Sequence, residues 1–241
     1  MRWVGPHATG VEPNRVRWAM EAGAICAVLG ISSGMGFQLW LVLEDSSAWV
    51  LAGLALGLGY VLADLLSGMV HWLADRYGSP ETPLLGNAFI QPFREHHFDP
   101  QAITRHDFVE TNGNNSMATL LVLIPAYLFI PVRPGNAASI FLSTLALAAC
   151  LSLYCTNQFH KWAHLNEPPR LARILQRCRL VLPKEHHQVH HTAPFDTYYC
   201  ITTGWLNWPL QKLRFFEFLE WFLSKVCLLK LGFGKDALQE K

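Results

Sequence analysis

Four apolar stretches alternate with polar segments along the chain and predict its main helices. The first two, residues 22–43 and 48–73, each hold an uncharged run close to the roughly 20 helical residues that cross a bilayer core. The other two cover residues 117–132 and 137–159. This pattern predicts an all-α integral membrane protein with about four transmembrane helices, built as a single domain over residues 1–241.

The third stretch is the shortest, and it contains Pro125 and Pro131, which favour a tilted or kinked span. Alternatively, it pairs with the fourth stretch as a hairpin across the turn Arg133-Pro134-Gly135-Asn136. The first stretch is too long for a cleaved signal peptide and lacks a small-residue cleavage pattern, so we expect a retained anchor helix. Residues 215–233 mix aromatic and charged side chains, which predicts an interfacial helix.

Composition and charge agree with a membrane location and set an orientation. The chain is 51% hydrophobic and 15% charged, and its formal net charge of +1 predicts no nucleic-acid partner. Lys and Arg gather near the N-terminus, between the second and third stretches, and after residue 159. The positive-inside rule therefore places both termini and the segments 71–116 and 160–214 in the cytosol, which four spans satisfy. We expect the endoplasmic reticulum in a eukaryote and the inner membrane in a bacterium.

Ten of the eleven histidines lie between residues 71 and 191. Neutral imidazole is a common ligand for iron, zinc, copper and nickel. The predicted topology puts all ten on the cytosolic face, which a single shared metal site requires. We therefore expect the metal ligands to come from His71, His96, His97, His106, His160, His164, His186, His187, His190 and His191.

Spacing within these groups supports the hypothesis. His160 and His164 are four residues apart, as are His71 and Asp75, so in a helix each pair lies on one face. Helical spacing would also stack residue 186 over 190 and residue 187 over 191, so that the four rings share one broad face. Acidic and amide side chains nearby are candidates for the outer shell: Asp75 (which is also a possible ligand), Asn114 and Asp196.

The number and type of ligands narrow the chemistry. Eight or more imidazoles are too many for one ion but suit two, and two irons at a membrane surface point to O2 activation for attack on a lipid C–H bond. The six cysteines show no C-x-x-C spacing, so they predict neither a zinc thiolate site nor a disulfide framework. A bis-imidazole haem would use only two of the ten histidines. The non-enzyme alternative is a membrane redox or signalling protein that binds metal or haem without turnover.

One basic stretch has a second interpretation. Arg170, Arg173 and Arg177 recur at three- and four-residue steps with apolar side chains opposite them. They predict a helix on the membrane surface that contacts a lipid phosphate, although a topology signal on a solvated face explains them equally well.

Four long strings carry a resemblance to a known family. In order and spacing, residues 68–214 resemble the Kua/CarF family of lipid desaturases, the plasmanylethanolamine desaturases, through HWLADRYGS, IQPFREHHFDPQAITRHDFVETNGNN, TNQFHKWAH and LPKEHHQVHHTAPFDTYYCITTGWLNWPL. One departure is the HKWSH box of the family, in which Ala163 replaces the serine here.

The resemblance implies a reaction. It predicts a desaturase that introduces the vinyl ether double bond into the 1-O-alkyl chain of an ether phospholipid, using two iron ions, O2 and electrons from a cytochrome b5-type or ferredoxin-type donor. The alternative within the enzymes is an acyl-lipid desaturase or hydroxylase with the same ligand set, since a related plant branch acts on phosphatidylglycerol. The scissile C–H bonds lie next to the glycerol, so a site at the inner ends of the spans reaches them without burying the headgroup.

Overall fold

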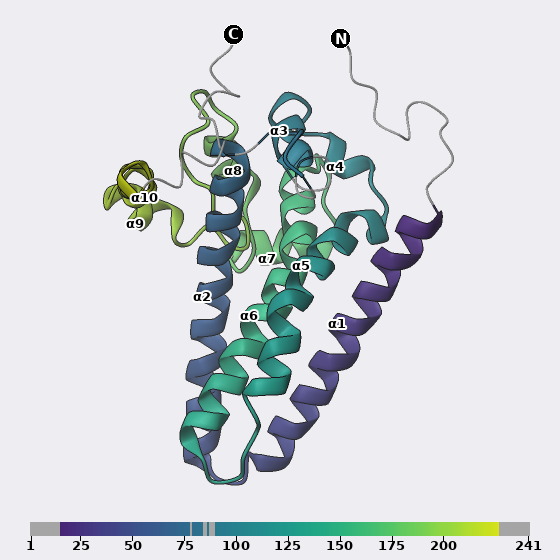
Figure 1. The fold of residues 1–241 in the computed structure, drawn as a ribbon, viewed down its shortest axis with the longest axis vertical. Helices are drawn as coiled ribbons and strands as arrows, with labels where there is room; N and C mark the ends of the chain where they lie inside the picture. The colour runs from purple at the N-terminus through teal and green to yellow at the C-terminus, as the bar shows by residue number, and fades with distance from the viewer. Residues whose placement is uncertain (1–14, 78, 84–85, 87–89, 227–241) are drawn as a thin grey trace.

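Four long helices form the body of the molecule in a computed structural model that describes residues 15–77, 79–83, 86 and 90–226. Every regular element in this part of the chain is a helix, as the sequence predicts. The long helices run side by side as an elongated bundle (Figure 1): α1 Arg15–Val42, α2 Ser46–Arg76, α5 Phe108–Phe129 and α6 Ala137–His164.

Local capping explains where three of these helices begin. The Asp45 carboxylate accepts a hydrogen bond from Ala48 N at 2.7 Å at the start of α2. Asp107 and Glu110 form a reciprocal capping box at the start of α5. The side chain of Asn136 accepts from the backbone N–H of Ser139 at 2.9 Å at the start of α6. Each helix therefore starts where a polar side chain satisfies its free N–H groups.

Three of the long helices, α1, α2 and α6, are long and apolar enough to cross a membrane. Helix α5 is not one of these three, and its first turns carry the polar side chains of Asn112, Asn114 and Asn115. It also begins nine residues earlier than the expected stretch 117–132, and it packs against α6 beyond the connecting turn. Gly135 adopts a φ of 66° in that turn, a backbone conformation that favours glycine.

Close packing joins α2 to α6 and α1 to α5. At Gly59 of α2, an added Cβ would lie 2.6 Å from Leu145 O and 2.7 Å from Ala148 Cβ of α6. The missing side chain therefore lets the two backbones approach. At Gly113 of α5, an added Cβ would overlap Cβ of Glu21 in α1.

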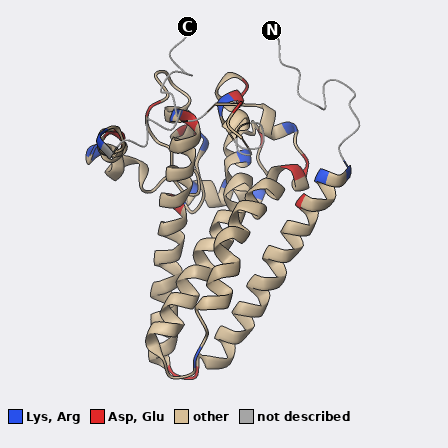
Figure 2. Ribbon diagram, viewed as in Figure 1, with Lys and Arg blue, Asp and Glu red and all other residues tan. Residues whose placement is uncertain are grey.

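Short helices gather around one end of the bundle. They are α3 Gln91–Phe98, α4 Ala102–Arg105, α7 Arg170–Arg177, α8 Lys184–His190, α9 Asn207–Lys212 and α10 Phe215–Val226. Figure 2 shows that charged residues concentrate at this end, whereas the bundle towards the other end is uncharged until the links that close it. The expected interfacial helix 215–233 corresponds to α10 up to residue 226, and residues 227–233 lie outside the described residues.

Helix α10 docks onto the end of α2. Arg76 Nε donates to Glu220 Oε1 at 2.8 Å, and Phe216 packs against the buried rings of Trp72 and Tyr199. Its opposite face exposes Trp221 and other aromatic rings. This division of contacts suits a helix that lies along the membrane surface.

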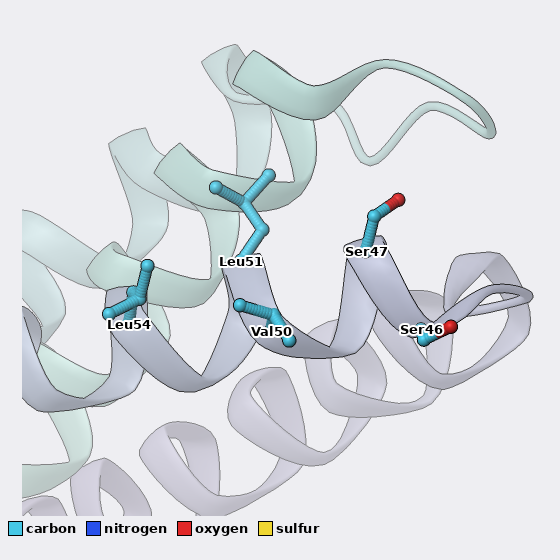
Figure 3. Close-up of a pocket in the computed structure, with 5 residues that line it drawn as sticks. All are labelled: Ser46, Ser47, Val50, Leu51 and Leu54. Carbon is cyan, nitrogen blue, oxygen red and sulfur yellow. The ribbon is translucent and has the colours of Figure 1, made fainter.

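A shallow hollow marks the far end of α2 (Figure 3), lined by Ser46, Ser47, Val50, Leu51 and Leu54. His71 lies 17 residues beyond Leu54, the lining residue nearest to it, which is roughly 26 Å along the helix at about 1.5 Å per residue. The hollow is therefore remote from the histidines.

Candidate metal centre

Two pairs of side chains near the C-terminal ends of α2 and α6 form the base of the centre. His71 and Asp75 lie one turn apart on α2, and His160 and His164 lie one turn apart on α6. All four are buried. Since α2 and α6 pack along their lengths, the two pairs face one another at the end of the bundle.

Helices α3 and α8 close over this base and complete two groups of ligands. The first group contains five histidines, His96, His160, His164, His187 and His191. The second group contains His71, Asp75, His97 and His190. The adjacent residues His96 and His97 of α3 therefore belong to different groups. The same is true of His190, which ends α8, and His191, which follows it.

The five rings of the first group turn their Nε2 atoms towards one another. Nε2 of His160 lies 2.8 Å from Nε2 of His187 and 3.2 Å from Nε2 of His164. Nε2 of His191 lies 3.0 Å from that of His187 and 3.1 Å from that of His96. A set of neutral imidazoles has too few protons at these atoms to satisfy every lone pair, and a shared cation would satisfy them.

The second group converges on one carboxylate. Oδ2 of Asp75 lies 3.3 Å from Nε2 of His71, 3.1 Å from that of His97 and 3.5 Å from that of His190. These three nitrogens and both Asp75 oxygens are buried without a hydrogen-bond partner in the described chain. Unsatisfied buried polar atoms are costly, so their concentration here fits a cation.

The donor spacing also fits metal ions. Donors bound to one ion at about 2.0–2.1 Å lie roughly 3.3–3.4 Å apart in tetrahedral geometry, and neighbouring donors lie roughly 2.8–3.0 Å apart in octahedral geometry. The distances in both groups cover these ranges. The groups are neighbours, since the ring centroids of His97 and His191 are 5.4 Å apart and those of His187 and His190 are 5.7 Å apart. The residues therefore fit two adjacent ions.

Backbone carbonyls orient two of the ligand rings. His71 Nδ1 donates to Tyr199 O at 3.1 Å, and His190 Nδ1 donates to Thr197 O at 2.7 Å. Because the proton sits on Nδ1 in both rings, Nε2 keeps its lone pair for a metal. The sequence does not reveal these acceptors, since every residue has a carbonyl.

Burial keeps several rings of the first group neutral. It lowers the pKa of His96 and of His187 well below the ordinary 6.5, and the neighbouring imidazoles lower both further. For His191, burial is again the largest cause and lowers the pKa to about 2. Neutral imidazole is the form that binds metal, so these three residues of the first group can bind a metal at physiological pH.

Two of the ten histidines lie outside both groups. His186 turns away from its neighbours on α8, and its Nε2 donates to Gly204 O at 3.0 Å while its ring stacks on Tyr198. His106 follows α4, is partly buried, and its carbonyl accepts from Lys161. The expected proximity of residues 187 and 191 is present in the structure. Residues 186 and 190, in contrast, have different partners, so the four rings do not share one face.

The other residues expected near the site do not belong to either group. Asn114 is partly buried on α5, and Asp196 is exposed. Arg170, Arg173 and Arg177 are all exposed on α7, where the last two line a surface cleft together with Lys184. Ala163, which replaces a serine of the family motif, is buried against Leu182 and Ile201.

A carboxylate inside α2 holds the loop that supports the second group. Asp64 Oδ1 accepts from the backbone N–H groups of Thr203 and Gly204 at 2.8 and 2.9 Å, and its Oδ2 accepts from Leu206 N at 3.1 Å. The same loop begins at Tyr199, whose carbonyl orients His71. An ionisable residue within a membrane-spanning helix is a sequence signal for such a role.

Comparison with known proteins identifies relatives. Residues 60–230 match the family model described as a lipid desaturase domain. A plasmanylethanolamine desaturase of Myxococcus xanthus is 46% identical over 202 residues, which cover 84% of this chain and 70% of the relative. Plasmanylethanolamine desaturase 1 of Mus musculus is 42% identical over 85% of this chain and 83% of its own length.

Plant proteins match at lower identity. The chloroplastic fatty acid desaturase 4 of Arabidopsis thaliana is 36% identical over 77% of this chain and 53% of its own length. No solved structure matches the chain.

Proposed function

The chain belongs to the lipid desaturase family, and from this membership we propose that it converts plasmanylethanolamine to a plasmalogen by introducing the vinyl ether double bond into the 1-O-alkyl chain. The observation that carries the proposal is the pair of adjacent ligand groups at the end of an apolar bundle. Two relatives that match most of the chain, at 46% and 42% identity, are named for this activity.

We propose that two iron ions are the cofactor. Bound iron would supply the activation of O2 and the oxidising power for removing two hydrogens from neighbouring carbons. Five histidines would hold one ion, and three histidines with Asp75 would hold the other. Tyr199 O and Thr197 O keep the Nδ1 protons of His71 and His190 in place, which fixes the direction of both Nε2 lone pairs. A cytochrome b5-type or ferredoxin-type protein would supply the electrons.

The chain is an integral membrane protein, and we propose that α5 is its fourth span. With four spans, the start of α1, the segment that follows α6 and the histidine groups all lie on the cytosolic face. The membrane would be the endoplasmic reticulum in a eukaryote and the inner membrane in a bacterium. In this orientation the bonds next to the glycerol of an ether lipid are near the ligand groups, while the alkyl chain stays among the apolar helices.

Lipid analysis tests the function. The full chain is expressed in cells that make plasmanylethanolamine but no plasmalogen, beside a His187→Ala variant that lacks one ligand of the first group. We expect acid-labile vinyl ether lipids to accumulate at the expense of the saturated ether lipid with the unaltered chain only. Mass spectrometry of the lipids and the iron content of the purified protein provide the measurements.

Other outcomes identify the alternatives. A new double bond or hydroxyl group in an ester-linked acyl chain, with the ether lipids unchanged, would replace the proposal by an acyl-lipid desaturase or hydroxylase. An intense Soret band in the absorption spectrum would show haem and contradict the proposed site of two non-haem iron ions.

A further inference from the structure

We propose that the cleft between α7 and the start of α8 binds the phosphate group of the phospholipid substrate. This inference rests on the proposed function, because it assigns a place to the headgroup of the lipid that the metal centre oxidises. Its chemistry is recognition of a phosphate oxyanion by guanidinium and ammonium groups at the membrane surface.

The cleft has a volume of about 240 Å³ and a positive lining. Three cations face it, Arg173 and Arg177 from α7 and Lys184 from α8, against the single carboxylate of Glu185. Lys184 Nζ donates to Asn166 Oδ1 at 3.0 Å, which holds the amine at the rim. The excess of positive charge suits a phosphodiester.

The two arginines remain available for a ligand. Within the described chain neither Arg173 nor Arg177 forms an ion pair, whereas Arg76 pairs with Glu220 and Arg105 pairs with Asp99. A guanidinium group presents several donors in a fixed plane, which matches the oxygens of a phosphate. Both side chains can therefore bind a phosphate without first breaking a protein contact.

Helix α7 is oriented as a membrane-surface helix requires. Ala172 is buried against the protein, while Leu171 and Ile174 are 62% and 47% exposed on a neighbouring edge. The cations occupy the remaining edge, at three- and four-residue steps. At a membrane surface, the apolar edge of α7 would contact the acyl chains and its cationic edge would contact the lipid phosphates. The cleft then lies at the height of the lipid headgroups.

The cleft adjoins the first ligand group. Leu165, which lines it, directly follows the ligand His164, so their Cα atoms are about 3.8 Å apart. Lys184 lies three residues before the ligand His187 on α8, which is close to one helical turn. In an ether phospholipid, only the glycerol backbone separates the phosphate from the first alkyl carbon, so both can be held at the same time.

Binding measurements on the full-length, iron-loaded protein in detergent test the cleft. The probe is 1-O-alkyl-2-acyl-glycerophosphoethanolamine, and the reference is 1-O-alkyl-2-acylglycerol with the same chains and no phosphate. Native mass spectrometry gives the amount of each lipid bound. We expect Arg173→Gln/Arg177→Gln to weaken phospholipid binding by about tenfold or more, the effect of losing a charge-assisted contact, and to leave the neutral lipid unchanged.

Matched variants separate the cleft from charge in general. Lys212→Gln removes an exposed cation of α9 outside the cleft and should leave both lipids bound as before. Arg173→Lys/Arg177→Lys keeps the charge and should retain part of the binding. Lys184→Gln removes the cation supplied by α8, so it tests the cleft even where the double arginine variant does not fold.

Equal phospholipid binding by the folded glutamine variants and the unaltered protein would overturn the proposal. A titration with inorganic phosphate distinguishes the two sources of the ligand. We expect millimolar phosphate to leave the lipid bound, and tight phosphate binding without any effect of the variants on the lipid would assign the cleft to free phosphate instead. Because binding is read directly, phospholipid loss in the variants supports the cleft even if the unaltered protein forms no vinyl ether.

Discussion

Adjacent histidines in α3 and α8 have different surroundings although they share a sequence motif. His96 contributes to the first ligand group and His97 to the second. His187 is buried in the first group, while His186 binds a backbone carbonyl outside both groups. One step along a helix rotates a side chain by about 100°, so neighbouring residues face different partners. The motif alone therefore cannot assign a ligand.

This contrast predicts different effects of two neighbouring substitutions. We expect His187→Gln to lose iron from the first group and to reduce desaturation on the order of 100-fold or more, since ligand loss exceeds the effect of removing an outer contact. His186→Gln should keep its iron and lose about 1 kcal/mol of stability with the Gly204 hydrogen bond. Iron content and thermal unfolding of both purified variants check this. Iron loss in His186→Gln would make it a ligand instead.

Asp75 provides a second prediction, because a ligand and a structural ion pair respond differently to Asp75→Asn. If the carboxylate binds metal, the change should weaken binding to the second group by about 10–100-fold or more. The metal-free variant should unfold at the same or a higher temperature than the metal-free original, because a buried and uncompensated charge is removed. Metal titration and calorimetry measure both effects, and a variant that loses stability without iron would indicate a structural pair.

The sequence predicts the ligand side chains better than their supports. Histidines spaced by four residues in an apolar chain are visible without a structure, as His160 and His164 illustrate. The carbonyls of Tyr199 and Thr197 are not visible, because no side chain marks them. The assignment of each histidine to one of two groups depends on how α3 and α8 fold back over α2 and α6, and this is a tertiary property.

At the scale of elements, small residues set how the long helices pack. Gly59 faces α6, and an added Cβ there would meet Leu145 O and Ala148. Gly57 lies two residues away on the same helix, is exposed, and has no atom within 4 Å of an added Cβ. Both glycines look alike in the sequence, and only the packing distinguishes them.

The two glycines form a matched pair for a test of α2–α6 packing. Gly59→Ala should force the helices apart at a cost of about 1–3 kcal/mol, whereas Gly57→Ala should be neutral or slightly stabilising because alanine favours the helix. Separation of α2 from α6 would also move His71 away from His160, so Gly59→Ala should bind iron less tightly. Apparent unfolding temperature in detergent and iron content are the measurements. Equal behaviour of the two variants would contradict the close contact.

The boundaries of α5 show what hydropathy misses. The apolar stretch 117–132 covers the apolar part of the helix, but Asp107 and Glu110 start the helix nine residues earlier through their capping box. Those additional turns carry Asn112 and Asn115, which bond to residues of α6. Hydropathy therefore locates the apolar part of this helix, and capping residues locate its start.

At the scale of the molecule, the charged residues and the metal-ligand groups lie at the same end of the bundle. Figure 2 shows charged residues gathered around α3, α7 and α8, with a few more in the far links. Both ligand groups and the phosphate cleft lie at the charged end. A substrate held there would keep its headgroup in the polar layer while its alkyl chain follows the uncharged bundle. In the proposed orientation, the positive-inside charge, the metal ligands and the headgroup contacts therefore lie on the same face of the membrane.

Labelling from one side of the membrane tests that orientation. Ala137 is exposed where α6 begins, next to the link from α5, and the natural Cys178 is exposed directly after α7. These positions face opposite sides if α6 crosses the membrane, and Ala137 lies on the non-cytosolic side only if α5 crosses it as well. In sealed vesicles whose outer surface corresponds to the non-cytosolic face, we expect a membrane-impermeant maleimide to label Ala137→Cys at once and Cys178 only after permeabilisation. Peptide mapping by mass spectrometry distinguishes the two sites from the other cysteines. Labelling of both positions from the same side would mean that α6 does not cross, and labelling of Cys178 at once with Ala137→Cys protected would mean that α5 does not cross. In either case the histidine groups would need a different position relative to the lipid.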